Sequence, residues 1–92
     1  MDVARRFGEN LRRCRRRADL SQEELGMRSS LHRTEIGLLE RGARIPRIDT
    51  LIKISSALKI PPVELIEGIK WTPGNTTSGS FSIASKGDPR SN

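Results

Sequence analysis

The sequence has few of the residues that build disulfide frameworks and metal sites. Its 92 residues include one cysteine, Cys14, and one histidine, His32. A single cysteine excludes an internal disulfide and a cysteine-based zinc site, and it is typical of a reducing compartment. No second histidine or cysteine can join His32 in a metal site. We therefore expect neither a metal nor a cofactor.

Long apolar segments and targeting signals are also missing. No apolar run approaches the roughly 20 residues that cross a bilayer. The N-terminus alternates charge from Asp2 onward and lacks the apolar core of a signal peptide. The sequence thus predicts a cytoplasmic, nucleoid-associated chain that does not bind a membrane.

Patterns of catalytic sites are absent as well. The sequence contains no nucleophile with its base, no phosphate-cradling glycine loop and no cluster of metal ligands. A single domain of this size also leaves little room for a buried catalytic pocket. We expect a protein that is not an enzyme.

Positive charge is what the sequence has in excess. Seventeen Lys and Arg stand against eleven Asp and Glu, which gives a net charge of +6 and a pI near 10.7. Such a balance favours a polyanionic partner, with nucleic acid ahead of a membrane surface. A merely soluble basic protein is the alternative that charge alone leaves open.

The first predicted helix is amphipathic. Phe7, Leu11, Cys14 and Ala18 recur at helical spacing and form one apolar stripe. Its other positions carry arginines, so the outer face is strongly basic. They are Arg5, Arg6, Arg12, Arg13, Arg15, Arg16 and Arg17.

A second helix begins with a capping box. Ser21 is placed to cap the helix, and Glu24 can accept from the backbone N–H of Ser21. Leu20 and Leu25 occupy the two positions of a hydrophobic staple.

A third helix begins in a similar way. His32 is a weaker cap, Glu35 can interact with the helix start, and Leu31 and Ile36 form the staple. Only residues 27–30 separate this helix from the one before it. Two short helices joined by so tight a turn predict a helix-turn-helix.

Two more helices complete the predicted domain. After a basic loop at 43–47, a fourth helix has its apolar face from Ile48 to Leu58. A fifth, short helix follows Pro62 and ends at Gly68. The sequence therefore predicts an all-α, compact five-helix domain over residues 1–69.

The segment 70–92 forms a C-terminal tail that is rich in Gly, Ser, Thr, Pro and Asn. Its composition favours a flexible, disordered tail. A short β-hairpin is the alternative, since apolar and polar residues alternate at two places. These places are Ile69 with Trp71, and Phe81 with Ile83, separated by a possible turn at Pro73-Gly74-Asn75.

A string of polar, glycine and core positions runs through the middle of the chain. It starts with Leu20-Ser21-Gln22-Glu23-Glu24-Leu25-Gly26 and continues through Leu31, Ile36, Leu39-Glu40-Arg41-Gly42, Pro46 and Ile48-Asp49-Thr50-Leu51. With this pattern, the segment from Phe7 to Ile69 resembles the family of the phage lambda and 434 repressors, Cro and bacterial xenobiotic-response regulators. The resemblance implies a helix-turn-helix fold and DNA binding.

Three positions depart from the family pattern. Ser30 stands where a glycine usually forms the turn in a left-handed conformation, so serine should cost some stability. Cys14 replaces a larger aliphatic core residue. Arg47 stands where a serine or threonine usually caps the fourth helix.

The resemblance places the N-terminal residues of the third helix against base edges in the major groove. Arg33 can donate two hydrogen bonds to guanine, and Glu35 can accept one from cytosine. The resemblance also implies contacts with the DNA backbone and one internal ion pair. The base-reading positions are Arg33, Thr34, Glu35, Gly37 and Leu38; the phosphate-contacting positions are Gln22, His32, Arg44 and Arg47; the ion pair joins Arg15 to Glu40.

Relatives of this type pair across a two-fold axis and read two half-sites. We expect a homodimer whose contacts come from the end of the helical domain and from the tail. The candidates are Leu58, Ile60, Val63, Leu65, Ile66, Trp71, Phe81 and Ile83. For the helical residues, the alternative is that they only close the monomer's own core.

The resemblance therefore predicts a bacterial, sequence-specific DNA-binding transcription regulator, acting as a dimeric repressor on an inverted repeat. The alternative is an antitoxin or adaptor whose main role is to bind a protein partner through the 70–92 tail.

Overall fold

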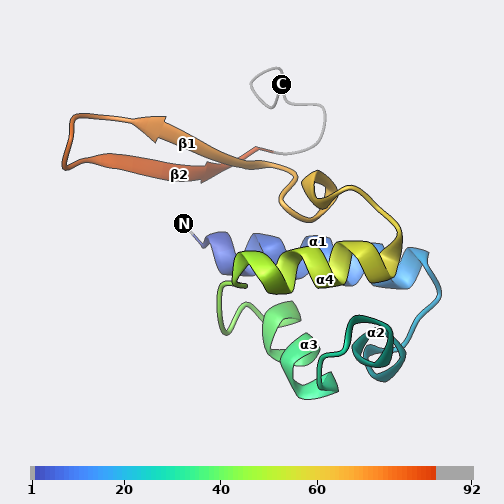
Figure 1. Ribbon diagram of the computed structural model, residues 1–92. Helices are drawn as coiled ribbons and strands as arrows, with labels where there is room; N and C mark the ends of the chain where they lie inside the picture. The colour runs from blue at the N-terminus through green and yellow to red at the C-terminus, as the bar shows by residue number, and fades with distance from the viewer. Residues whose placement is uncertain (1, 85–92) are drawn as a thin grey trace.

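Helices form the body of the protein, and a hairpin of two strands extends from it (Figure 1). The computed structural model describes residues 2–84. The elements are α1 (Val3–Arg17), α2 (Gln22–Ser29), α3 (Arg33–Glu40), α4 (Ile48–Leu58), the 3₁₀ turn η1 (Pro62–Leu65), β1 (Ile69–Pro73) and β2 (Gly79–Ile83).

The predicted helix starts are confirmed. Ser21 Oγ accepts from the backbone N–H of Glu24, whose carboxylate accepts from the N–H of Ser21 in return. His32 caps α3, because its Nδ1 accepts from the backbone N–H of Thr34 at 3.0 Å. Arg47 precedes α4 and makes no capping hydrogen bond. Side-chain caps thus mark the starts of α2 and α3, and α4 begins without one.

The turn between α2 and α3 has the backbone expected from the family pattern. Ser30 lies in the left-handed region, with φ 59° and ψ 39°. Its backbone N–H bonds to the carbonyls of Gly26 and Met27, which satisfies two groups at the end of α2. A non-glycine residue therefore holds the strained conformation of this turn.

The core lies between α1, α2, α3 and α4. Apolar side chains from every helix and from η1 meet there and are shielded from water. They are Phe7, Leu11, Cys14, Leu20, Leu25, Ile36, Leu39, Leu51, Ile54, Leu58 and Leu65.

Two parts of the predicted fold class were wrong. The predicted fifth helix is the 3₁₀ turn Pro62–Leu65, too short for α-helical hydrogen bonding to become established. The fold is also not purely α, because β1 and β2 form an antiparallel hairpin. The residues from 85 onward in the predicted tail lie outside the described part of the chain.

The hairpin begins at Ile69, beside the predicted domain boundary. Its register pairs Ile69 with Ile83, Trp71 with Phe81 and Pro73 with Gly79. Pro73 is a strand residue, so the turn falls later than predicted. Figure 1 shows that α1 and α4 lie between the hairpin and α3. None of the helices in residues 2–84 is both long and apolar enough to span a bilayer.

Candidate nucleic-acid interface

The N-terminal end of α3 is open to solvent. The Arg33 side chain is 65% exposed and pairs with Glu23, at 3.4 Å, in an equally exposed ion pair. Thr34 is also exposed, and Leu38, one turn further along, is partly exposed. An ion pair of this kind contributes little to stability, so Arg33 can leave Glu23 at small cost for a better acceptor.

A shallow depression runs beside the predicted reading residues. Its volume is about 280 Å³, and its lining consists of Gln22, Arg33, Thr34, Gly37 and Arg41. A Cβ added to Gly37 would lie 3.1 Å from Arg41 Nη1 and 3.4 Å from Gln22 Oε1. Glycine at this position therefore keeps the depression open.

Arg41 is a residue that our sequence analysis did not assign to the site. It follows Gly37 by four residues and Arg33 by eight, which places all three on one side of the helix axis. This spacing is the feature of the sequence that could have identified Arg41 as a site residue. The backbone at Arg41 caps the C-terminal end of α3.

The C-terminal end of α3 is anchored by a buried carboxylate. Arg15 Nη2 donates to Glu40 Oε1 at 2.9 Å, and Arg15 Nε donates to Oε2. Gln22 Nε2 adds a hydrogen bond to Oε1 at 3.1 Å, and Arg12 Nε approaches the same oxygen at 3.4 Å. The two predicted ion-pair residues thus lie at the centre of a network that joins α1, α2 and α3.

Hydrogen bonds determine the charge states of Glu40 and Arg15. The Glu40 side chain is fully shielded from solvent. Burial raises its pKa, but the hydrogen bonds from Arg15 and Gln22 outweigh burial and leave the pKa below its usual range. The same hydrogen bond raises the pKa of Arg15. Both groups are therefore charged at neutral pH.

A close approach of backbones supports the same anchor. A Cβ on Gly8 of α1 would lie 2.5 Å from the carbonyl oxygens of Leu39 and Glu40. Only glycine lets α1 lie this close to the end of α3. Sequence reasoning missed Gly8, because no local pattern shows that the end of α3 approaches this glycine.

Two of the predicted backbone-contacting residues, Arg44 and Arg47, lie in the loop between α3 and α4. Arg44 Nη1 donates to Glu35 Oε1 at 2.8 Å, which ties the 43–47 loop to the first turn of α3. Arg47 pairs with Asp49 at 3.3 Å, and both side chains are more than half exposed. Glu35 thus contacts Arg44 instead of the helix start.

The predicted dimer residues divide into three groups by their burial. Leu58 and Leu65 are buried in the chain's own core, which removes them from the predicted dimer surface. Ile60 is partly buried against that core. The remaining candidates reach solvent, fully or in part. They are Val63, Ile66, Trp71, Phe81 and Ile83.

Comparison with known proteins matches this geometry to a family and to solved structures. The family model described as helix-turn-helix matches residues 11–65. The HTH-type transcriptional regulator y4dJ of Sinorhizobium fredii is 38% identical over 76 residues, which are 83% of this chain and 99% of that protein. The restriction-modification controller protein C.AhdI from Aeromonas hydrophila is 40% identical, with a TM-score of 0.66 over 67% of this chain and 94% of that chain. The P22 c2 repressor, solved with a synthetic operator, is 29% identical, with a TM-score of 0.62 over the same shares.

Proposed function

Because the chain belongs to the helix-turn-helix family, we propose that it is a transcription regulator, not an enzyme, that binds double-stranded DNA at a specific sequence. The exposed N-terminal end of α3, with Arg33 and Thr34 beside an open depression, is the observation that carries this proposal. The P22 c2 repressor binds an operator, and its similarity supports the same role here.

α3 enters the major groove with its first turn leading. Arg33 donates two hydrogen bonds to O6 and N7 of a guanine, and the Thr34 methyl group contacts a thymine methyl. Glu35 accepts from the amino group of a cytosine when Arg44 turns to a phosphate. Leu38 adds apolar contact, and Gly37 allows the helix to approach the bases closely.

Contacts with the sugar–phosphate backbone fix this orientation. Arg44 and Arg47 in the loop after α3, and His32 at the start of α3, are exposed and can reach phosphates. Gln22 stands at the N-terminus of α2, where the backbone N–H groups and the helix dipole favour a phosphate. Such contacts position the domain without reading sequence.

A single domain of this size contacts too few bases for a unique site. We infer that the protein binds as a homodimer to an inverted repeat, with half-sites about one helical turn apart, and represses transcription. The exposed residues Val63, Ile66, Trp71 and Phe81 support an interface on the side away from α3.

Selection from random duplex DNA, repeated at two salt concentrations, tests this function. We expect an inverted repeat to be enriched. Arg33→Ala should relax one base position in each half-site at a cost of about 1–3 kcal/mol. Lys53→Ala, which removes an exposed charge on α4, is the matched control and should leave the selected motif unchanged. Salt-sensitive binding without any motif would contradict the proposal and would favour an antitoxin or adaptor role.

Arg47→Ala tests the assignment of phosphate contacts. Loss of one such contact should weaken binding to every sequence alike and lower the slope of log Kd against log salt by about 1. The measurement is a titration of operator and non-operator duplexes across a salt series. A change confined to the operator would show that Arg47 reads bases instead.

The similarity to C.AhdI favours a narrower role, control of restriction-modification genes. The selected motif should then occur upstream of the protein's own gene and of a neighbouring endonuclease gene. A motif found only at unrelated promoters would contradict this role and leave the general function intact.

A further inference from the structure

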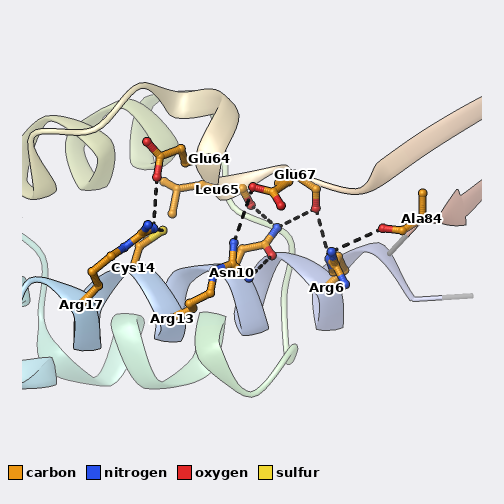
Figure 2. Close-up of polar contacts among 9 residues, drawn as sticks. All are labelled: Arg6, Asn10, Arg13, Cys14, Arg17, Glu64, Leu65, Glu67 and Ala84. Carbon is orange, nitrogen blue, oxygen red and sulfur yellow. Dashed lines mark hydrogen bonds and ion pairs between the residues drawn. The ribbon is translucent and has the colours of Figure 1, made fainter. Parts of the chain in front are cut away.

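The root of the hairpin, where Glu67 precedes β1 and Ala84 follows β2, is hydrogen-bonded to α1. Arg6 Nε donates to the carbonyl of Glu67 at 3.1 Å, and its Nη2 approaches the carbonyl of Ala84 at 3.5 Å (Figure 2). Asn10 is fully buried, and its amide donates to the carbonyls of Leu65 and Glu67, both at 3.0 Å. The hairpin is therefore held in a defined direction as it leaves the helical body.

The register shows which backbone groups point outward. Ala84 N–H bonds to the carbonyl of Gly68 at 2.8 Å, and Gly74 N–H bonds to the carbonyl of Ser78 at 3.1 Å. Bonded pairs alternate with non-bonded pairs in an antiparallel ladder, so the facing pair Trp71 and Phe81 is non-bonded. The backbone groups of odd-numbered strand residues thus point away from the hairpin.

The two edges of the hairpin are unequal. On β1, the outward residue Pro73 has no N–H, and the N–H of Ile69 already bonds to the carbonyl of Ile66. On β2, the outward residues Gly79, Phe81 and Ile83 all carry both a donor and an acceptor. Proline is a device that blocks strand addition. The β1 edge is blocked. The β2 edge is open at Gly79 and Phe81, and at Ile83 it borders a hollow of about 430 Å³ that Asp2, Arg5, Arg6 and Glu9 also line.

One face of the hairpin is apolar beyond the point where the body covers it. Trp71 and Phe81 lie with ring centroids 4.9 Å apart in an edge-to-face arrangement. They remain 54% and 48% exposed. The Trp71 ring extends over Gly79, where a Cβ would lie 2.3 Å from the ring. This packing fixes the ring in place while leaving much of it in water.

We propose that the β2 edge pairs with β2 of a second copy, antiparallel around a two-fold axis at Phe81, to form a four-stranded sheet. In this register Phe81 faces Phe81 of the second copy, and Gly79 faces its Ile83, so all outward groups find partners. The aromatic pairs of both copies then form one continuous apolar row. This proposal rests on the dimer of the proposed function and names its interface.

Three observations favour a second copy as the occupant. The outward groups of β2 are self-complementary, because an antiparallel pair around a two-fold axis exchanges identical donors and acceptors. β2 carries no charged side chain, so two copies meet there without the repulsion that the arginine-rich outer face of α1 would cause. A hairpin of two strands is marginal in water, and a sheet of four is not.

The arrangement leaves the candidate DNA interface free. α1 and α4 separate the hairpin from α3 (Figure 1). Pairing through β2 therefore buries neither Arg33 nor Thr34, which lie on α3. Each copy presents its own α3 to one half-site.

Backbone methylation tests the open edge. N-methylation of Phe81 removes an outward donor of β2 but none of the hydrogen bonds within the hairpin. N-methylation of Trp71 makes the same change on the blocked edge and is the matched control. We expect sedimentation equilibrium to give a dimer for the unmodified chain and for methylated Trp71, and a monomer for methylated Phe81. A monomer for the unmodified chain, or equal behaviour of the two methylated chains, would overturn the proposal.

A disulfide trap tests the register. Ser80 of one copy should face Ser82 of the other as a non-bonded pair, with Cβ atoms about 5 Å apart. The double variant Ser80→Cys/Ser82→Cys should therefore form a crosslinked dimer on mild oxidation. Ser82→Cys alone should not, because its two thiols lie diagonally apart. Absence of the crosslink would overturn this register.

The DNA selection described above is read separately, so a regulator that dimerises elsewhere would still yield an inverted repeat.

Discussion

Glu40 is the residue on which the position of α3 depends. Its carboxylate is fully shielded and accepts from Arg15, Gln22 and Arg12, on two other helices. Loss of one partner from a buried ion pair leaves the other charge without compensation, at a cost of about 3 kcal/mol. Glu40→Ala should therefore lower the melting temperature much more than Glu35→Ala, which removes only the partly exposed pair with Arg44. Equal melting temperatures for the two variants would contradict the anchoring role.

The pH dependence of stability isolates the charge of Glu40. Its pKa is lowered in the folded state, against the effect of burial, by hydrogen bonds from Arg15 and Gln22. A lowered pKa contributes stability that is complete above the unfolded value, about 4.3, and is lost as the pH falls through the folded value.

The control for this effect is Glu40→Gln, which keeps the shape and removes the charge. The difference in free energy of unfolding between wild type and variant should be constant near pH 7 and should shrink below about pH 4. Urea titrations at a series of pH values measure it. A difference that stays constant down to strong acid would show that the charge contributes nothing.

The sequence revealed some of these residue roles and hid others. The Ser21 and His32 caps act within a few residues, so local spacing was enough to predict them. Leu58 and Leu65 share the apolar character of surface contacts, and only the packing of α4 against α2 and η1, and of η1 against α1, decides that they are buried. The contact of Gly8 with the end of α3 likewise depends on tertiary structure.

At the scale of elements, the turn between α2 and α3 stores strain. Ser30 holds φ 59°, a region that costs a residue with a Cβ about 1 kcal/mol or more relative to glycine. Ser30→Gly should therefore raise stability by about 0.5–1 kcal/mol, although glycine also gains entropy in the unfolded chain. The matched control is Ser56→Gly on the exposed face of α4, which should lower stability. Thermal unfolding of both variants checks the sign, and a loss of stability at both positions would contradict the strain.

The hairpin is the element for which the sequence left two alternatives open. Alternation of apolar and polar residues gave a hairpin as one of two alternatives, and the composition favoured disorder. Whether this segment forms a hairpin depends on contacts between residues far apart in the chain, such as Arg6 with Ala84 and Asn10 with Glu67. The strand role of Pro73 was missed because its missing N–H matters only once the register is known.

At the scale of the whole molecule, the two ends have different chemistry. The end with α3 carries Arg33, and Arg44 paired with Glu35, and the opposite end carries the exposed aromatic pair of Trp71 and Phe81. α1 connects them, because its buried stripe packs against α3 while Arg6 and Asn10 bind the hairpin root. The direction of the hairpin is therefore fixed relative to the reading helix.

Arg6→Ala tests this connection. The variant loses the hydrogen bonds to the carbonyls of Glu67 and Ala84, so the hairpin should move relative to the body while the helical core stays folded. We expect lower fluorescence anisotropy of Trp71, faster exchange of the Ala84 amide proton, and a small change in melting temperature. Arg16→Ala, which removes the same charge from an exposed position on α1, should change none of the three.

If both variants left Trp71 equally rigid, the strands themselves, and not Arg6, would set the direction of the hairpin. If Arg6→Ala also weakened binding to an inverted repeat but not to a single half-site, the spacing between the two reading helices would be shown to depend on this root.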